Sequence, residues 1–203
     1  MSIEISLEFS GPFAWSSKGD LPCVFDAHVS SHAGIYLWTV STPEGDLIYY
    51  VGETGRDFTT RLTEHLKDQL AGMCRIYDPH LFLQGVKKPL WGGMFGRLRE
   101  RGLSDFVAKL SELSPALIRF VQIIQFHLAP LECDDRLRKR IEAALADLYV
   151  QDGVVGQFQD DDIRYEQTRQ DEEPLTVTFR WSGRVCGVPD RLFVSWARGN
   201  GAA

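Results

Sequence analysis

The chain has 203 residues, of which 44% are hydrophobic and 25% are charged, so it can bury a core without disulfides or a structural metal. Its four cysteines include no Cys-X-X-Cys pair, and no apolar run approaches the roughly 20 residues that a membrane-spanning helix requires. Composition thus argues against a disulfide-rich secreted protein and against a membrane protein, and we expect a reduced, cytoplasmic protein.

The formal charge of -6 is distributed unevenly along the chain. Residues 151–174 contain eight acidic and two basic side chains, so this stretch accounts for the whole negative excess. We expect it to be a solvated acidic loop that repels DNA or binds a protein partner. Residues 50–120 carry eleven Lys or Arg against eight acidic residues, so this part of the chain can face a polyanion.

The first half of the chain predicts a strand, a hairpin and a helix. The segment SIEISLEF alternates polar and apolar residues, as a half-buried strand does. GIYLWTV and DLIYYVG are rich in β-branched and aromatic residues, and TPEGD between them supplies the turn of a hairpin. Asp57 can cap the following helix, which we expect to end at Gly72.

The second half predicts further helices and strands after an irregular region over residues 72–101. LSDFVAKLSEL indicates a short helix from Ser104 that Pro115 stops. ALIRFVQIIQFHL favours a buried strand, with a helix as the alternative. DDRLRKRIEAALADLYV has one apolar face and an acidic start, which is typical of a helix. LTVTFRW and RLFVSW indicate a closing hairpin.

Two short motifs and three single residues fall on these elements in a characteristic order. The tripeptide GIY stands at residues 34–36 on the first hairpin strand, and YVG stands at residues 50–52 on the second. Arg61 follows on the first helix, with His65 one turn later, and Glu142 lies on a later helix. In these residues and their order the chain resembles the GIY-YIG nuclease family.

The resemblance implies metal-dependent hydrolysis of DNA phosphodiester bonds. Tyr36 would be the general base, with a phenol pKa lowered by neighbouring cations, and Tyr50 would position the water or the phosphate. Arg61 would stabilise the transition-state charge and His65 would relay a proton. Glu142 would be the only carboxylate on Mg²⁺ or Mn²⁺, which is sufficient because Mg²⁺ keeps several waters.

The resemblance also implies an α/β fold in which a central, mostly antiparallel sheet is flanked by helices. It covers residues 34–158, which we expect to form a GIY-YIG nuclease-like domain. Residues 1–33 would be an N-terminal extension with a strand. Residues 159–203 would form the acidic loop and a C-terminal hairpin, both packed on the same domain.

The segment KKPLWGGMFGRLRER interleaves basic with aromatic residues, which suits contacts to phosphates and to exposed bases. A loop that packs its aromatic residues inward and solvates its charges would give the same pattern. The basic residues that would bind DNA are Lys87, Lys88, Arg97, Arg99 and Arg101.

The chain departs from the family pattern after the glutamate helix. The family commonly carries an asparagine there, whereas QDGVVGQFQDD contains none and Gln157 is the nearest substitute. This departure leaves two alternatives to a nuclease. One is a module of the same fold that binds nucleic acid without cutting it. The other is a protein-interaction module that uses the acidic loop or the C-terminal hairpin.

Overall fold

The computed structural model describes residues 3–94, 99–151, 165–183 and 185–196, with only the backbone of residues 99–101 and 149–151. The elements in chain order are β1 (Ile3–Ala14), the 3₁₀ helix η1 (His28–Ser31), β2 (Gly34–Thr42), β3 (Gly45–Thr54), α1 (Phe58–Leu70), β4 (Ile76–Tyr77), α2 (Pro79–Phe82), β5 (Pro89–Trp91), α3 (Arg99–Ile123), β6 (Ile124–Pro130), α4 (Asp135–Gln151), β7 (Leu175–Trp181) and β8 (Arg191–Val194).

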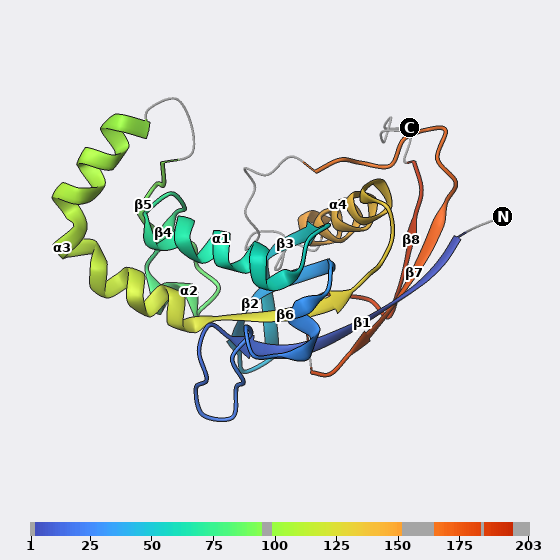
Figure 1. The fold of residues 1–203 in the computed structure, drawn as a ribbon, viewed down its shortest axis with the longest axis horizontal. Helices are drawn as coiled ribbons and strands as arrows, with labels where there is room; N and C mark the ends of the chain where they lie inside the picture. The colour runs from blue at the N-terminus through green and yellow to red at the C-terminus, as the bar shows by residue number, and fades with distance from the viewer. Residues whose placement is uncertain (1–2, 95–98, 152–164, 184, 197–203) are drawn as a thin grey trace.

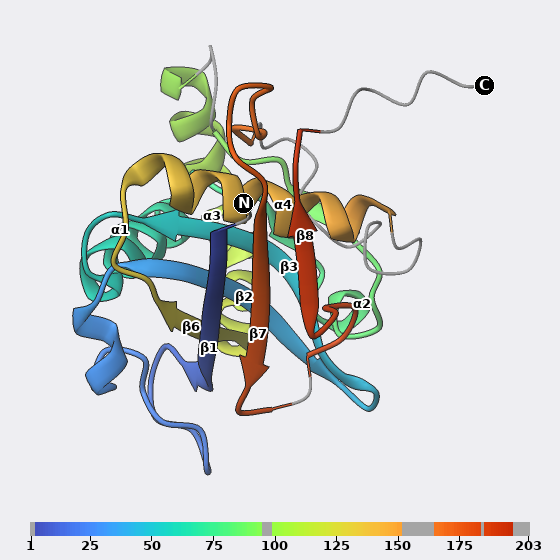
Figure 2. The ribbon, with the colours of Figure 1, turned by 90° about the vertical axis from the view of Figure 1, so that its right-hand side faces the viewer.

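A six-stranded sheet with the order β3-β2-β6-β1-β7-β8 forms the centre of the molecule (Figures 1 and 2). Its neighbouring strands are antiparallel except β1 and β7, which run parallel over the whole of Ile3 to Phe9. The predicted α/β class with a central sheet is therefore confirmed, and the sheet is mixed. A separate pair, β4 and β5, forms a small second sheet.

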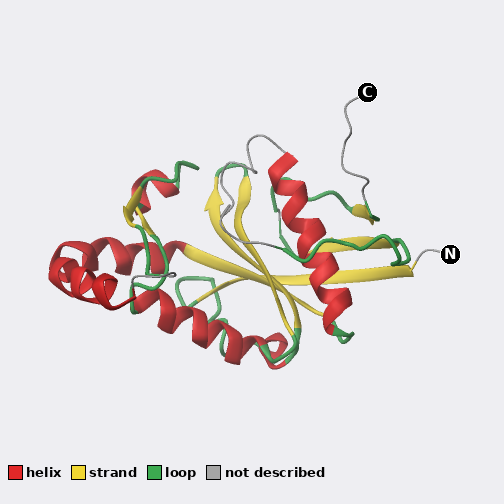
Figure 3. Ribbon diagram, turned by 90° about the horizontal axis from the view of Figure 1, so that it is seen from above, coloured by secondary structure: helices red, strands yellow, loops and turns green. Residues whose placement is uncertain are grey.

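The predicted hairpin and first helix are confirmed. Strand β2 is buried from Gly34 through Val40 because its alternate side chains face packed layers on both sides of the sheet. Asp57 caps α1 through its carboxylate, which accepts a hydrogen bond from the Thr60 amide at 2.7 Å. Figure 3 shows the helices flanking the strands.

The prediction that this helix ends at Pro115 is wrong, because α3 continues through the proline to Ile123. Leu113 and Leu117, on either side of Pro115, are buried in one cluster with Ile76, so packing outweighs the backbone hydrogen bond that proline cannot make. The predicted strand over ALIRFVQIIQFHL consequently begins only at Ile124. In Figure 1, α3 projects away from the sheet at the left.

The segments expected at the two ends of the chain share this central sheet. Strand β1 lies between β6 and β7, and the predicted closing hairpin is confirmed as β7 and β8. The region predicted to be irregular contains β4, α2 and β5. Within the part of the chain that the structure describes, none of the helices has the length and apolar character needed to cross a lipid bilayer.

The acidic stretch is not simply a solvated loop, because its described part is tied to α4. Glu172 accepts a hydrogen bond from Arg136 Nε at 2.5 Å, and Glu166 accepts one from Lys139 Nζ at 2.6 Å. The buried Arg140 donates to the carbonyl oxygen of Glu173 at 2.6 Å. These ion pairs neutralise acidic charge locally, which leaves less of it to repel a polyanion.

Candidate active site

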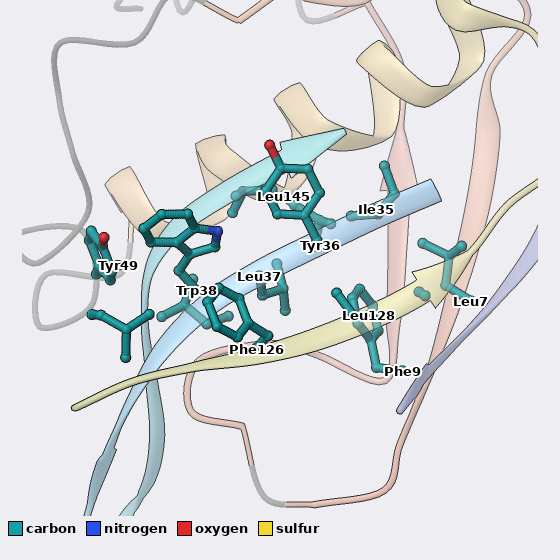
Figure 4. Packing of buried hydrophobic residues seen from close by; sticks show 14 of the residues in the cluster. Leu7, Phe9, Ile35, Tyr36, Leu37, Trp38, Tyr49, Phe126, Leu128 and Leu145 are labelled. Carbon is teal, nitrogen blue, oxygen red and sulfur yellow. The ribbon is translucent and has the colours of Figure 1, made fainter. Parts of the chain in front are cut away.

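Tyr36 lies at the centre of the site, fully buried on β2 (Figure 4). Its cross-strand partner is Gly52 on β3, and its ring lies directly over that glycine. A Cβ atom at Gly52 would lie 2.3 Å from Tyr36 Cζ, so only glycine leaves room for the phenol. The tyrosine of the GIY motif thus requires the glycine of the YVG motif.

Gly34 of the first motif must also be glycine, but for a different steric reason. Its φ is 154°, and a Cβ atom there would lie 2.1 Å from the carbonyl oxygen of Ala129 on the neighbouring strand β6. Glycine therefore allows β2 and β6 to approach closely at the end of the sheet where Tyr36 stands.

Helix α1 supplies two of the groups that contact the Tyr36 hydroxyl. His65 Nε2 lies 2.8 Å from Tyr36 Oη, and Arg61 Nε donates to the same oxygen at 3.3 Å. The two side chains are four residues apart and therefore share one flank of the helix. Tyr50 lies beside Tyr36, with ring centroids 6.0 Å apart.

The predicted lowering of the Tyr36 pKa is wrong. Burial raises the pKa of the Tyr36 phenol well above its usual value, the nearby Tyr50 phenol raises it further, and Arg61 offsets these effects only in part. Burial also lowers the pKa of His65 to about 3, with the Arg61 charge as the second cause. At neutral pH the site therefore holds a protonated phenol beside a neutral imidazole.

Glu142 reaches the hairpin from α4. Its Oε1 accepts a hydrogen bond from the backbone amide of Glu53 at 3.0 Å. Burial raises the pKa of Glu142 to about 7, and the negative charge of Glu53 adds to this effect, while Arg61 lowers the pKa. The Glu142 charge raises the pKa of Tyr50 and the Arg61 charge lowers the pKa of Glu142, so these groups act on one another electrostatically.

The residues around Glu142 fit a hard divalent cation bound through one carboxylate oxygen. Among the described residues, Oε2 of Glu142 has no hydrogen-bond partner, so one oxygen is available. A cation would also stabilise the ionised form of this carboxyl, which burial and then the Glu53 charge disfavour. The described residues contain no group of three or more His, Cys, Asp or Glu suited to a metal, so water and substrate would have to complete the coordination.

Glu53 and Arg138 support the site, and sequence reasoning did not single them out. Arg138 is 4% exposed and donates from Nε to Glu53 Oε2 at 3.1 Å. It also pairs with Asp135 at the start of α4. Arg138 thereby holds Glu53, whose amide orients Glu142. Two sequence features could have pointed to this pair, a glutamate directly after the YVG motif and an arginine four residues before Glu142. Charged residues of this kind are usually solvated, so neither stood out.

A β-bulge brings a further aromatic residue to the site. Trp38 pairs with Tyr50 and Thr39 pairs with Ile48, so Tyr49 is an extra residue in β3. Tyr49 and Tyr50 consequently line the same cavity although they are adjacent in sequence. Regular alternation would send them to opposite faces, which is why the sequence indicates only one of them.

The structure brings Tyr36, Tyr50, Arg61 and His65 into contact, and it places Glu142 against the amide of Glu53 on the same hairpin. It describes the predicted DNA-binding segment only in part. Lys88 is exposed and Lys87 half-buried, just before β5. Arg97 lies outside the described residues, as does Gln157. Arg99 and Arg101 belong to α3, but their side chains are likewise outside the described part.

Gly52→Ala is expected to lower the free energy of unfolding by about 2 kcal/mol, because the new methyl group would displace the Tyr36 ring from a packed core. Chemical denaturation measures this change. Gly92→Ala is the matched control, since a Cβ atom there would meet nothing within 4 Å. Equal stability of the two variants would show that the Tyr36 ring does not depend on Gly52.

Comparisons with models of protein families, with curated proteins and with solved structures found no match to this chain.

Proposed function

We propose that this chain is a metal-dependent endonuclease of the GIY-YIG type, which hydrolyses phosphodiester bonds of DNA. The observation that carries the proposal is the convergence on one phenol oxygen. His65 and Arg61 both lie within hydrogen-bond distance of Tyr36 Oη, and Glu142 is coupled electrostatically to Arg61. In this proposal Tyr36 would be the base, Arg61 the cation that binds the phosphate and Glu142 the metal ligand, which are the groups that phosphodiester hydrolysis requires.

Arg61 would bind the phosphate that is cleaved. Its guanidinium is half-buried, and its Nη1 is only 3.4 Å from Glu64, which also pairs with Arg56. Because Arg56 already neutralises Glu64, Arg61 can turn towards a phosphate without leaving a carboxylate unpaired. A planar guanidinium then donates to two oxygens as negative charge develops on them.

Tyr36 and His65 would move the proton of the attacking water. The raised pKa of Tyr36 means that the phenol starts protonated, so it must pass its proton to His65 as it accepts one from water. A bound phosphate would place a negative charge beside His65 and thereby raise the pKa of this imidazole from about 3 towards neutrality. Binding of the substrate would therefore make proton transfer from Tyr36 to His65 more favourable.

Glu142 would hold Mg²⁺ or Mn²⁺ through its free oxygen. When bound, the cation supplies Lewis-acid stabilisation of the oxygen that leaves. The backbone amide of Glu53 keeps the carboxylate oriented, and Arg138 keeps Glu53 in place.

The experiment that tests the proposal is nicking of supercoiled plasmid by the purified protein, with and without Mg²⁺ or Mn²⁺. Nicking that depends on the metal supports the nuclease. A shift of DNA in a native gel without any nicking would favour a module that binds nucleic acid without cutting it. The high pKa of Tyr36 keeps its phenol protonated, and the low pKa of His65 makes its imidazole a weak base, so both favour this second function.

The raised pKa of Glu142 predicts a stability that depends on pH. Its folded pKa of about 7 exceeds the ordinary value of 4.5, so the protonated form stabilises the fold at low pH. This contribution is lost as the pH rises through 7. Glu142→Gln should therefore be more stable than the unmutated chain at pH 8, by about 2 kcal/mol, and nearly equal at pH 5.

Thermal unfolding at the two pH values measures this difference. Added Mg²⁺ should raise the unfolding temperature of the unmutated chain at pH 8 but not that of Glu142→Gln, because only the carboxylate binds the ion. An equal Mg²⁺ effect on both proteins would place the ion elsewhere.

A further inference from the structure

A cavity of about 350 Å³ opens beside the candidate active site. Tyr50, Arg61 and His65 belong to its walls and also to the site, so the cavity adjoins the site. The volume falls within the range of about 300–1,000 Å³ that is usual for small-molecule sites. The proposed reaction does not use the remainder of the cavity.

Aromatic rings form the deep walls of the cavity. Trp38 and Tyr49 project from the hairpin beside one another, with ring centroids 5.8 Å apart and planes at 74° (Figure 4). Phe120 from α3 and Tyr77 from β4 complete these walls, with centroids 5.8 Å apart. Faces and edges of rings set at different angles suit a flat aromatic ligand.

Polar groups stand among these rings. Asp68 and Gln69, from the end of α1, line the cavity together with Arg75. Gln69 is 3% exposed and is fixed by a hydrogen bond from its Nε2 to the Arg75 carbonyl oxygen at 3.1 Å. A carboxylate acceptor and a guanidinium donor near aromatic walls are the groups that recognise the polar edge of a heterocycle.

The aromatic walls are recessed. Trp38 is 3% exposed and Phe120 is 1% exposed, so they form the closed floor, and a ligand would contact mainly the more exposed Tyr50 and His65 beside Arg61. A base that remains stacked within a duplex cannot enter such a cavity. A base that has left the stack is a flat heterocycle with a polar edge, and it stays covalently tied to the backbone phosphate that Arg61 would bind. One such base can therefore occupy the cavity while its own or the adjoining phosphate lies at the active site.

We propose that this cavity binds one unstacked nucleobase beside the phosphodiester to be cut, so that the substrate is DNA with an unpaired or extruded nucleotide at the cleavage site. The inference rests on the proposed function for the identity of the ligand as DNA. The binding of the base does not depend on catalysis, and the two can be tested separately.

The test compares two duplexes that differ only in one unpaired nucleotide, which is an adenosine in one and an abasic residue in the other. Fluorescence anisotropy without divalent ions measures their affinities. The unmutated protein should bind the adenosine duplex about tenfold more tightly, as expected when one base stacks on aromatic side chains. Cleavage of both duplexes is then measured separately after Mg²⁺ is added.

Cys74→Trp is the variant that tests the place of the base, because Cys74 lines the cavity and a larger side chain would fill it. We expect its two affinities to become equal. Cys23→Trp is the matched control, since Cys23 lies beside β1 and lines a different cavity, and it should keep the tenfold preference. Circular dichroism verifies the fold of both variants.

Should Cys74→Trp not fold, benzyl methanethiosulfonate fills the cavity after folding by reacting with Cys74 in a chain whose other cysteines are serine. Equal affinities of the unmutated protein for the two duplexes would overturn the base-binding inference, whether or not DNA is cleaved. A preference that survives filling of the cavity would overturn it as well. A tenfold preference without cleavage would sustain the base site and contradict only the proposed nuclease.

Discussion

Glu142→Gln should lower Mg²⁺-dependent cleavage of DNA by about three orders of magnitude, as expected when a metal that stabilises a transferred phosphate is lost. The amide has the same volume as the carboxyl group and can still accept the hydrogen bond from the Glu53 amide, so the fold should survive. DNA binding should persist or strengthen slightly, because one negative charge near the phosphates is removed. Single-turnover cleavage and fluorescence anisotropy measure the two effects.

Asp147→Asn is the matched control for this variant. Asp147 is also on α4, its pKa is also raised by burial, and it accepts a hydrogen bond from Gln167 at 3.0 Å. The substitution removes a carboxylate from the same helix without touching the site, so cleavage should be unchanged. If Asp147→Asn and Glu142→Gln lowered cleavage equally, the loss would come from the helix and not from a metal ligand.

Arg61→Ala is expected to lower cleavage by about three orders of magnitude and to weaken DNA binding about tenfold. The guanidinium would contact the phosphate in both the bound state and the transition state, so both quantities should fall. The dependence of binding on salt should become flatter because one phosphate contact is lost. Together with Glu142→Gln, which spares binding, this variant separates the phosphate ligand from the metal ligand.

Arg56→Ala tests whether the effect is specific to Arg61. Both arginines pair with Glu64, but Arg56 is more exposed, with 55% of its side chain accessible against 34% for Arg61. Losing Arg56 leaves the contact between Arg61 and Tyr36 intact, so cleavage should change less than tenfold. Similar losses for the two variants would argue for a general positive surface rather than a specific phosphate ligand.

The elements that carry the site could be predicted because their local signals agree. Asp57 marks the start of α1, and a turn sequence separates the two β-rich segments that form β2 and β3. The structure confirms all three elements. The continuation of α3 beyond Pro115 was missed because proline is a strong local stop signal, while Leu113 and Leu117 are buried in a cluster with the distant Ile76. Packing against residues distant in sequence cannot be read from a local sequence pattern.

The electrostatics of the site could not be predicted from residue types. A tyrosine near an arginine suggests a lowered pKa, yet burial of Tyr36 outweighs the effect of Arg61. The ion pairs of Glu166 and Glu172 likewise depend on which helix face the acidic stretch meets. Tyr36, Tyr50, Arg61 and His65 do lie in contact as predicted, and Glu142 reaches the same hairpin, but the roles of all five stay predictions.

The decisive measurement is the nicking of supercoiled plasmid by the unmutated protein and by Glu142→Gln, purified in parallel and incubated with Mg²⁺, with EDTA as the metal-free control. The unmutated protein should convert the plasmid to the nicked form, EDTA should stop the reaction, and Glu142→Gln should leave the plasmid supercoiled. Equal nicking by the two folded proteins, or binding of the plasmid without nicking by either, would contradict a nuclease centred on Tyr36, Arg61 and Glu142.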